Sequence, residues 1–288
     1  MREPGGGDAS GLALRLRGLL PPQVAVVART APLHRARLLA AERPAARSMG
    51  RARRSEFATG RALAREAMGR AGHIGHAAQA LPVGAHRQPL WPEGLLGSIS
   101  HSEGLFAVAV APADGCWALG IDVERLARLG PRRVAALRSV VLTEAERRAA
   151  PRDTPDDVRA LEIFSAKEAV FKALYGHVGR YFGFMAAEAV EQGPGRLLFR
   201  LTETLAPLLP VGTLIPVRVS SQDGVTVAAV CLEGAPARPV RRIDHPGIPR
   251  DRTDRLVPTW TQGAIAPAGP PPPTTLEGSE QGWGRSAH

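Results

Sequence analysis

The stretch Phe164-Ser-Ala-Lys-Glu-Ala-Val-Phe-Lys-Ala-Leu-Tyr175 is predicted to form a helix, because Ala, Leu, Lys and Glu favour that structure. Gly176 follows at the place where a glycine would cap the C-terminus of the helix. Glu168 lies in the register of the predicted buried face, and a buried carboxylate requires a nearby cation. The apolar residues of that face are Leu161, Phe164, Phe171 and Tyr175.

Lysine is confined to this stretch. The chain has 37 basic residues, but only Lys167 and Lys172 are lysines, and all the others are arginines. Lys172 lies one helical turn beyond Glu168, close enough to meet its carboxylate. Two lysines beside one carboxylate, in a chain that otherwise uses arginine, indicate that these positions need the chemistry of lysine.

Length and composition limit the number of domains, the kinds of partner and the cellular compartment that the sequence allows. A chain of 288 residues suits one large domain or two small ones. The formal net charge of +10 favours an acidic partner (nucleic acid, anionic membrane, phosphorylated cofactor or acidic protein), although a general excess of Arg and Ala explains it equally well. Cys116 and Cys231 form no CxxC pair, which fits a reducing compartment. No signal peptide and no membrane span are predicted, so we expect a cytoplasmic protein.

Helical and strand segments are predicted to form two units of similar size that meet near 112–115. The three strands nearest the boundary are expected to form a meander, and residues 236–288 a disordered tail. The predicted helices cover 12–20, 33–43, 45–70, 131–148 and 157–175, with a capping box at Thr143-Glu-Ala-Glu146. The predicted strands cover 23–28, 95–101, 105–111, 116–124, 196–202, 214–220 and 225–232. A basic stripe formed by Arg54, Arg61 and Arg65 is explained by a solvated helix face.

The predicted strand 116–124 has two different faces. One carries Trp117, Leu119, Ile121 and Val123, and the other carries Cys116, Ala118, Gly120, Asp122 and Glu124. Small side chains followed by acids would leave room for a bound group. With Glu168, the two acids would supply oxygen ligands that suit Mg²⁺ better than Zn²⁺, although solvated edge acids explain the pair equally well. A metal ion, lysines and arginines together indicate a phosphate-rich ligand.

The segment Gly97-Ser-Ile-Ser-His-Ser102 ends a predicted strand and enters a turn. It does not match the GxSxG nucleophile elbow, since the residue order differs and no helix follows. Two interpretations remain open. His101 either bonds backbone groups in the turn, or it contacts a phosphate or a base with Ser100 and Ser102 as hydroxyl donors.

Three motifs, in this order and spacing, resemble those of the Sfp-type 4′-phosphopantetheinyl transferases. They are Ser98-Ile-Ser-His-Ser102, Gly120-Ile-Asp-Val-Glu124 and Phe164-Ser-Ala-Lys-Glu-Ala-Val-Phe-Lys172. Two further segments resemble the enterobactin synthetase component D branch of that family. They are Arg53-Arg-Ser-Glu-Phe57 with Gly60-Arg61, and the run from Trp91 to His101. The resemblance covers residues 20–232.

The resemblance implies an α+β fold with two similar subdomains related by pseudo-twofold symmetry and a site between them. The subdomains would be 1–112 and 113–235, followed by the 236–288 tail. It implies a monomeric, Mg²⁺-dependent enzyme that transfers 4′-phosphopantetheine from coenzyme A to a serine of an acyl or peptidyl carrier protein. Adenosine 3′,5′-bisphosphate would be released. The basic surface would suit an acidic carrier from a siderophore, polyketide or fatty-acid system.

The resemblance also implies roles for individual residues. The Mg²⁺ site would comprise Asp122, Glu124, Glu168 and the backbone of Val123. Glu168 would act as ligand, as base for the carrier serine, or as both. Lys172 would bind phosphate, and Lys167 would position groups or transfer a proton. Contacts to the nucleotide end would come from Arg53, Arg61, Ser100 and His101.

Two more segments complete the expected coenzyme A site. The pantetheine arm would run along Tyr181-Phe-Gly-Phe184, with Phe182 as a contact. The loop Val83-Gly-Ala-His-Arg87 lacks the lysine that the branch often carries, so His86 or Arg87 would replace it.

Two other functions account for part of the same features. A Mg²⁺-dependent phosphohydrolase of nucleotides or coenzyme A would use the same acids and lysines, with water as the acceptor. A nucleic-acid-binding protein would use the arginines. That second function leaves the acids and the lysine pair unexplained.

Overall fold

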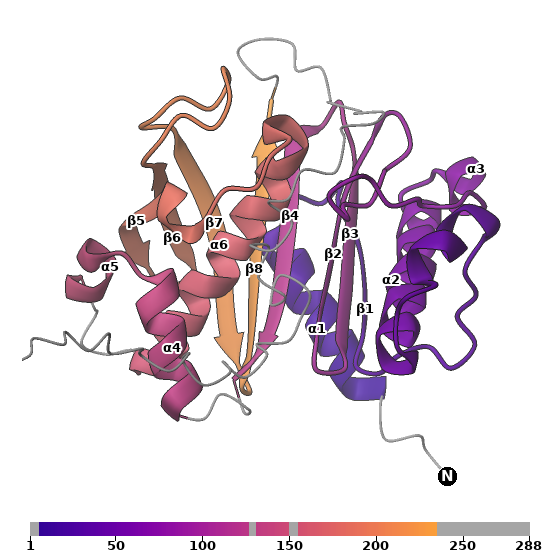
Figure 1. Ribbon diagram of the computed structural model, residues 1–288, viewed down its shortest axis with the longest axis horizontal. Helices are drawn as coiled ribbons and strands as arrows, with labels where there is room; N and C mark the ends of the chain where they lie inside the picture. The colour runs from indigo at the N-terminus through magenta and orange to yellow at the C-terminus, as the bar shows by residue number, and fades with distance from the viewer. Residues whose placement is uncertain (1–5, 127–130, 150–154, 235–288) are drawn as a thin grey trace, which may run out of the picture.

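The computed structural model describes residues 6–126, 131–149 and 155–234 (Figure 1). In the first half, β1, β3 and β2 pair in this order to form an antiparallel sheet, and the long helix α2 packs on it. The elements of this half are α1 (Gly6–Leu19), β1 (Ala25–Arg29), the 3-10 helix η1 (Ala40–Ala46), α2 (Arg51–Arg70), α3 (Ile74–Ala77), β2 (Leu95–Ser102) and β3 (Leu105–Pro112).

The second half is a larger antiparallel sheet in the order β4-β8-β7-β6-β5, and α6 packs on one face of it (Figure 1). Its elements are β4 (Cys116–Arg125), α4 (Pro131–Val141), α5 (Glu144–Arg148), α6 (Asp156–Val178), the 3-10 helix η3 (Phe184–Ala186), β5 (Ala187–Gly193), β6 (Arg196–Leu201), β7 (Leu214–Gln222) and β8 (Val225–Glu233). The α+β class is as predicted, with one long helix on each of two sheets.

Side chains along β3 point alternately to its two faces, and each face packs into a different hydrophobic core. Phe106, Val108 and Val110 pack toward α2, whereas Ala107 and Ala109 face the other way, toward the second sheet. Small alanine side chains on this inner face allow the two sheets to approach closely. The residues of β4 and β8 that meet this face are Leu119, Ile121, Val123, Val225, Val227 and Ala229. The two halves therefore share a continuous apolar core, to which α1 adds its leucines.

The predicted meander is wrong in its third strand. β2 and β3 form the expected hairpin, but β4 leaves them and pairs with β8 along its whole length. The loop between β3 and β4 is where the chain passes from the first sheet to the second, and this loop contains the predicted boundary.

The small residues of β4 leave no room for a ligand beside Gly120. A Cβ atom at Gly120 would lie 2.0 Å from the carbonyl oxygen of Ala169 and 2.6 Å from the backbone nitrogen of Ala173. The space is therefore filled by the backbone of α6. A β-bulge between Cys116 and Ala118 also changes the predicted faces. It places Cys116 in the core shared by the two sheets and Trp117 on the α6 side.

Other element boundaries differ for local reasons. The central helix continues past Gly176, and the cap is Gly179, whose φ of 67° is left-handed and whose N–H bonds the carbonyl of Tyr175. Residues 33–43 do not form an α-helix; only the 3-10 helix η1, which contains Pro44, lies there. The strand β5 was not predicted, because its Ala- and Glu-rich sequence has little strand preference.

Within the described residues, none of the helices has both the length and the apolar character needed to cross a bilayer. The predicted tail, residues 236–288, lies outside the described residues.

Candidate active site

Asp122 forms the centre of a buried polar cluster where β2, β4 and α6 meet. Its Oδ1 accepts a hydrogen bond from Ser100 Oγ at 2.9 Å and forms an ion pair with Lys172 Nζ at 2.6 Å. Lys172 also donates to Ser100 Oγ at 3.1 Å. Asp122 is 2 % exposed, so this pair lies in a low-dielectric setting where charge is strongly felt. The structure thus brings together three of the predicted residues from three different elements.

Two more carboxylates lie within electrostatic range of this cluster. The pKa of Glu168 is raised to about 7, because burial raises it strongly, Lys172 partly opposes that effect and Asp122 adds to it. Burial and the charge of Asp122 also raise the pKa of Glu124 well above its usual value. Burial alone would lower the pKa of Lys172, but Asp122 and Glu168 more than offset that effect and raise it. Three acids thus share one ammonium group, and the cluster lacks positive charge.

The donor set suits a hard divalent cation. Asp122 Oδ2 is buried and has no hydrogen-bond partner in the described part of the chain, which is an expensive condition for a carboxylate oxygen. The nearby acids Glu124 and Glu168 offer further oxygen ligands, which Mg²⁺ prefers. Among the described residues, no three His, Cys, Asp or Glu side chains already lie in the geometry of a metal site. At least one of the three acids would therefore have to change its side-chain position when a cation binds.

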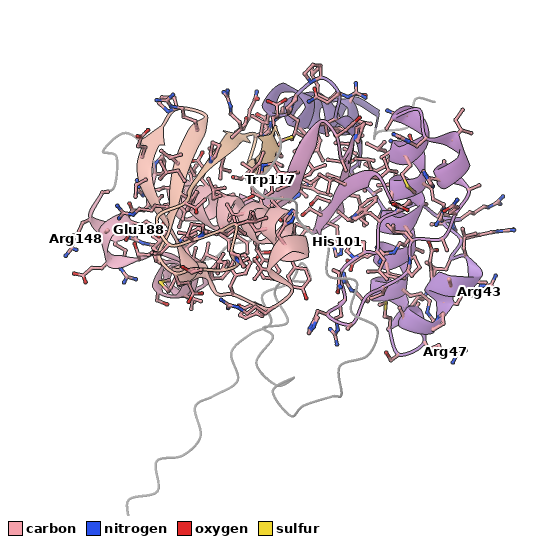
Figure 2. All side chains as sticks on the ribbon, turned by 90° about the horizontal axis from the view of Figure 1, so that it is seen from above. Arg43, Arg47, His101, Trp117, Arg148 and Glu188 are labelled. Carbon is pink, nitrogen blue, oxygen red and sulfur yellow. The ribbon has the colours of Figure 1, made fainter. Side chains whose placement is uncertain are left out.

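Arg53 and His101 form a second polar group next to the first. Arg53 Nη1 lies 2.6 Å from His101 Nε2, and since a guanidinium only donates, this ring nitrogen must be the acceptor. Burial and the charges of Arg53 and Lys172 lower the pKa of His101 to about 3, so the ring is neutral at physiological pH. Figure 2 shows His101 in the middle of the molecule, between the two halves. Because the charge of Lys172 acts on the His101 ring, His101 lies beside the cluster around Asp122.

The neutral His101 predicts a specific pH dependence of stability. Its pKa is lower in the folded protein than in the unfolded chain, so the unfolded state takes up a proton as the pH falls below about 6.5. The wild-type protein should therefore lose stability from about pH 6.5 downward, and His101→Gln should remove that part of the loss. Melting temperatures of both proteins at about pH 7.5 and about pH 5 measure the difference.

His34→Gln provides the control, because it alters an exposed histidine. We expect it to follow the pH dependence of the wild-type protein. Equal losses of melting temperature in His101→Gln and wild type would contradict the neutral, buried state of His101.

The predicted solvated stripe on α2 is wrong for Arg61, which is buried, and for Arg65, which is partly buried, whereas Arg54 is exposed. Arg54 Nε donates to the carbonyl of Ala46, and Arg65 forms an ion pair of 2.6 Å with the fully buried Glu42. Arg61 stacks on the Phe57 ring, with its guanidinium carbon 4.4 Å from the centroid. Burial lowers the pKa of Arg61 to about 10. Arg61 thus brings a largely desolvated cation to the same side of the first sheet as Arg53.

An apolar pocket adjoins Glu168. The segment that resembles the pantetheine-binding region closes it: Phe182 is buried, with its ring 4.9 Å from the ring of Phe171, and Tyr181 packs on Phe171 at 5.7 Å. The lining residues are Lys167, Glu168, Val170, Phe171, Tyr181, Phe182, Gly183, Phe184 and Ala187. Phe171 of α6 therefore faces this pocket, whereas Ala169 and Ala173 of the same helix face β4.

The loop with His86 and Arg87 approaches the same helix. The His86 ring lies 6.2 Å from the ring of Tyr175, and both His86 and Arg87 are exposed. Burial raises the pKa of Tyr175 to about 12, and its hydroxyl has no partner among the residues that the structure describes. The structure thus places this loop near the end of α6, two helical turns from Glu168.

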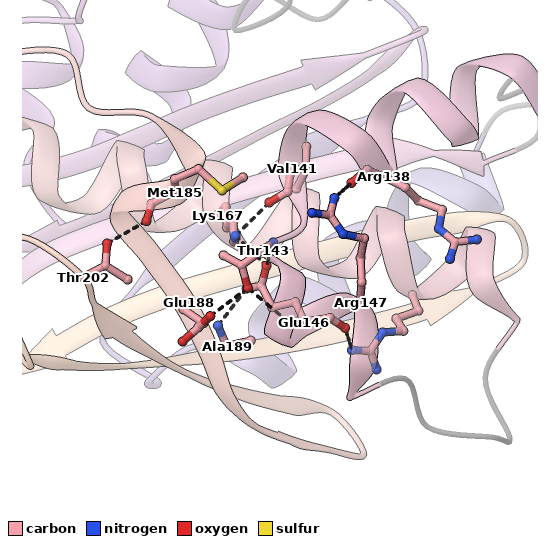
Figure 3. Close-up of polar contacts among 11 residues, drawn as sticks. Arg138, Val141, Thr143, Glu146, Arg147, Lys167, Met185, Glu188, Ala189 and Thr202 are labelled. Carbon is pink, nitrogen blue, oxygen red and sulfur yellow. Dashed lines mark hydrogen bonds and ion pairs between the residues drawn. The ribbon is translucent and has the colours of Figure 1, made fainter.

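Lys167 does not belong to the polar cluster around Asp122. Its ammonium donates to Glu146 Oε2 and to the carbonyl of Val141, both at 2.8 Å, and it is almost fully buried (Figure 3). Glu146 Oε1 accepts the N–H of Ala189, and Oε2 also accepts the N–H of Thr143. The predicted capping box of Thr143 and Glu146 is confirmed, but Glu146 also ties α5, α6 and β5 together.

This network predicts a large loss of stability in Glu146→Gln. The amide removes the carboxylate that pairs with the buried ammonium of Lys167, and breaking one side of a buried ion pair costs about 3–5 kcal/mol. Glu144→Gln is the matched control on the same helix, since its side chain is 73 % exposed and pairs with the equally exposed Arg148. It should change stability by less than about 1 kcal/mol. Urea unfolding measures both, and equal effects would show that the buried network contributes little.

Sequence patterns missed Glu146 as a partner of Lys167. The capping box was visible in the sequence, but its link to a lysine 21 residues later was not. They also missed the role of Ser98, whose hydroxyl accepts the N–H of Ile121. Both contacts join elements that are far apart in the chain, and no local spacing reports them.

Comparison with known proteins gives two family matches. Residues 41–111 match the 4′-phosphopantetheinyl transferase N-terminal domain, and residues 118–216 match the 4′-phosphopantetheinyl transferase superfamily. Among solved structures, the chain resembles two holo-acyl-carrier-protein synthases at low TM-scores. The Bacillus anthracis enzyme, in complex with CoA (3′,5′-ADP), has 23% identity and a TM-score of 0.33 over 42% of this chain and 99% of that one. The Thermotoga maritima enzyme has 24% identity and a TM-score of 0.32 over 41% of this chain and 64% of that one.

Curated relatives agree with the family matches. The 4′-phosphopantetheinyl transferase Svp of Streptomyces mobaraensis is 38% identical over 51% of this chain and 58% of its own length. Enterobactin synthase component D of Salmonella typhi is 31% identical over 58% of this chain and 68% of its own. The 4′-phosphopantetheinyl transferase PptT of Mycobacterium tuberculosis is 30% identical over 65% of this chain and 82% of its own. This chain therefore belongs to the 4′-phosphopantetheinyl transferase superfamily.

Proposed function

We propose that this chain transfers the 4′-phosphopantetheine group of coenzyme A to a serine of an acyl or peptidyl carrier protein. Adenosine 3′,5′-bisphosphate is the other product. The observation that carries the proposal is the Asp122 cluster: one carboxylate oxygen is held by Lys172 and Ser100, and the other is buried with no partner among the described residues. Such a site can stabilise the charge that develops on a reacting pyrophosphate.

The metal site of this proposal consists of Asp122, Glu124 and Glu168, with the backbone of Val123 beside it. Bound Mg²⁺ would neutralise charge on the pyrophosphate. Lys172 adds a fixed cation that already contacts Asp122 and so lies at the same place. Glu168 is ligand, base for the carrier serine, or both, and its raised pKa near Asp122 and Lys172 supports each role.

The first half supplies the nucleotide contacts. Arg53 and Arg61 offer cationic donors near the neutral His101, whose Nδ1–H is left to donate. Ser100 would contact the nucleotide by turning its single O–H away from Asp122. His86 or Arg87 extends this group from the loop beside Tyr175. The pantetheine arm would then run along the segment 181–184, with Phe182 as a contact. We assign Lys167 to holding α6 in place, since its ammonium is bound to Glu146.

The proposed partner is an acidic carrier protein. The net charge of +10 would attract such a partner and would be screened by salt. A siderophore, polyketide or fatty-acid system would supply the carrier, and a monomer is sufficient because both halves of the site lie in one chain.

Product release separates this proposal from the alternative phosphohydrolase. The protein is incubated with coenzyme A and Mg²⁺, with and without apo-carrier protein, and adenosine 3′,5′-bisphosphate is measured. Transfer predicts release only when the carrier is present. Release at the same rate without any carrier would instead establish hydrolysis with water as the acceptor.

A further inference from the structure

Serine side chains join the edges of the two sheets. Ser98, Ser100 and Ser102 alternate along β2, are 3–4 % exposed and point toward β4. β2 and β4 are each an edge strand of their sheet, so β4 has N–H groups that no neighbouring strand of its sheet can bind. Ser98 Oγ accepts the N–H of Ile121 at 3.0 Å, and Ser100 Oγ accepts the N–H of Val123 at 3.2 Å. Hydroxyl groups thus replace the missing strand partner.

Ser102 departs from this pattern. Its Oγ donates to the Oε2 atom of Glu124 at 2.7 Å, so it holds a side chain and not the backbone. Ser102 itself is fixed by the turn that follows it. Glu103 and Gly104 have φ values of 46° and 86°, and Ser102 pairs with Leu105 across a two-residue hairpin. The hydroxyl therefore approaches Glu124 from a rigid support.

We propose that Ser102 is a positioning residue that holds the Glu124 carboxylate in the orientation required to bind a divalent cation. This inference rests on the proposed function, because it assumes that Glu124 is a metal ligand. A carboxylate near the end of a strand can rotate freely, and a short hydrogen bond to one oxygen restricts that rotation and leaves the other oxygen available. Groups that orient metal ligands in this way commonly change metal affinity by about 10–100-fold.

Direct cation binding tests the proposal without any turnover. Mg²⁺ and Mn²⁺ are titrated into the purified full-length protein by calorimetry, in the absence of coenzyme A and carrier. We expect Ser102→Ala to weaken binding by about 10-fold or more. Ser98→Ala is the matched control, because it removes an equally buried hydroxyl from the same face of β2, one that bonds a backbone N–H. It should lower the melting temperature but leave cation affinity within about twofold of wild type.

The outcomes separate the two claims. Wild-type binding together with unchanged affinity in Ser102→Ala overturns the role of Ser102 alone. Failure of the wild-type protein to bind either cation overturns the proposed metal site and the role of Ser102 together. If Ser102→Ala does not fold, Ser102→Cys decides the question, since it retains a side chain at the site with only a weak S–H donor. A 10-fold loss in that variant supports the proposal, and wild-type affinity contradicts it.

Discussion

Replacing Gly120 with alanine is expected to prevent stable folding. The new Cβ atom would lie 2.0 Å from the carbonyl oxygen of Ala169 and 2.6 Å from the backbone nitrogen of Ala173. Both are backbone atoms inside α6, so neither can move aside by changing a rotamer. The helix would have to withdraw from β4 as a whole. Because Glu168 and Lys172 are on α6 and Asp122 is on β4, that movement would also separate the residues of the site.

We expect Gly120→Ala to lower the free energy of unfolding by at least about 4–5 kcal/mol, a large part of the stability of a typical domain. Gly176→Ala is a suitable control on the same helix, because a Cβ atom at that position would point into open space among the described residues. Alanine favours helices over glycine by up to about 1 kcal/mol, so this variant should be as stable as wild type or more so. Denaturant unfolding followed by circular dichroism compares them. Similar midpoints for the two variants would refute the close contact.

Replacing Asp122 with asparagine is expected to abolish phosphopantetheine transfer while the protein remains folded. The amide keeps the shape of the side chain and an oxygen that accepts from Ser100 and Lys172, but it removes the negative charge and the second carboxylate oxygen. Both are needed to hold a cation against the pyrophosphate. We expect a loss of at least about a thousandfold in the rate of transfer.

The control for this variant is Asp114→Asn, which makes the same chemical change in the exposed turn before β4. Its transfer rate should match that of wild type. Rates are measured by the release of adenosine 3′,5′-bisphosphate in the presence of carrier, and thermal unfolding checks that both variants are folded. Asp122→Asn with more than a tenth of the wild-type rate would rule out a central role for this carboxylate.

The sequence predicted most of the elements of the fold but not all of their contacts. Strand alternation correctly located β2, β3 and β4, yet it could not show that β4 pairs with β8, more than 100 residues later. The small residues before Asp122 suggested space for a ligand, whereas α6 occupies that space at Gly120. The pattern of residues along a strand shows that a small side chain is needed at a given position. It does not show whether a helix or a bound molecule lies against it.

The same limit applies to the site. Ser100, Asp122 and Lys172 meet as the motifs suggested, since each motif ends on a different element at one junction. Lys167 was grouped with Lys172 because they are close in sequence. Five residues along a helix correspond to a rotation of about 140°, and the two ammonium groups therefore point to different partners. Lys167 contacts Glu146, which no helical spacing could have indicated.

The most direct test of the proposed function is the intact mass of a panel of apo acyl and peptidyl carrier proteins after incubation with this protein, coenzyme A and Mg²⁺. We predict that at least one carrier gains the mass of a single phosphopantetheine group, that the group lies on a serine, and that Asp122→Asn gives no such product. Unmodified masses for every carrier, with the wild-type protein folded and coenzyme A present, would contradict the account.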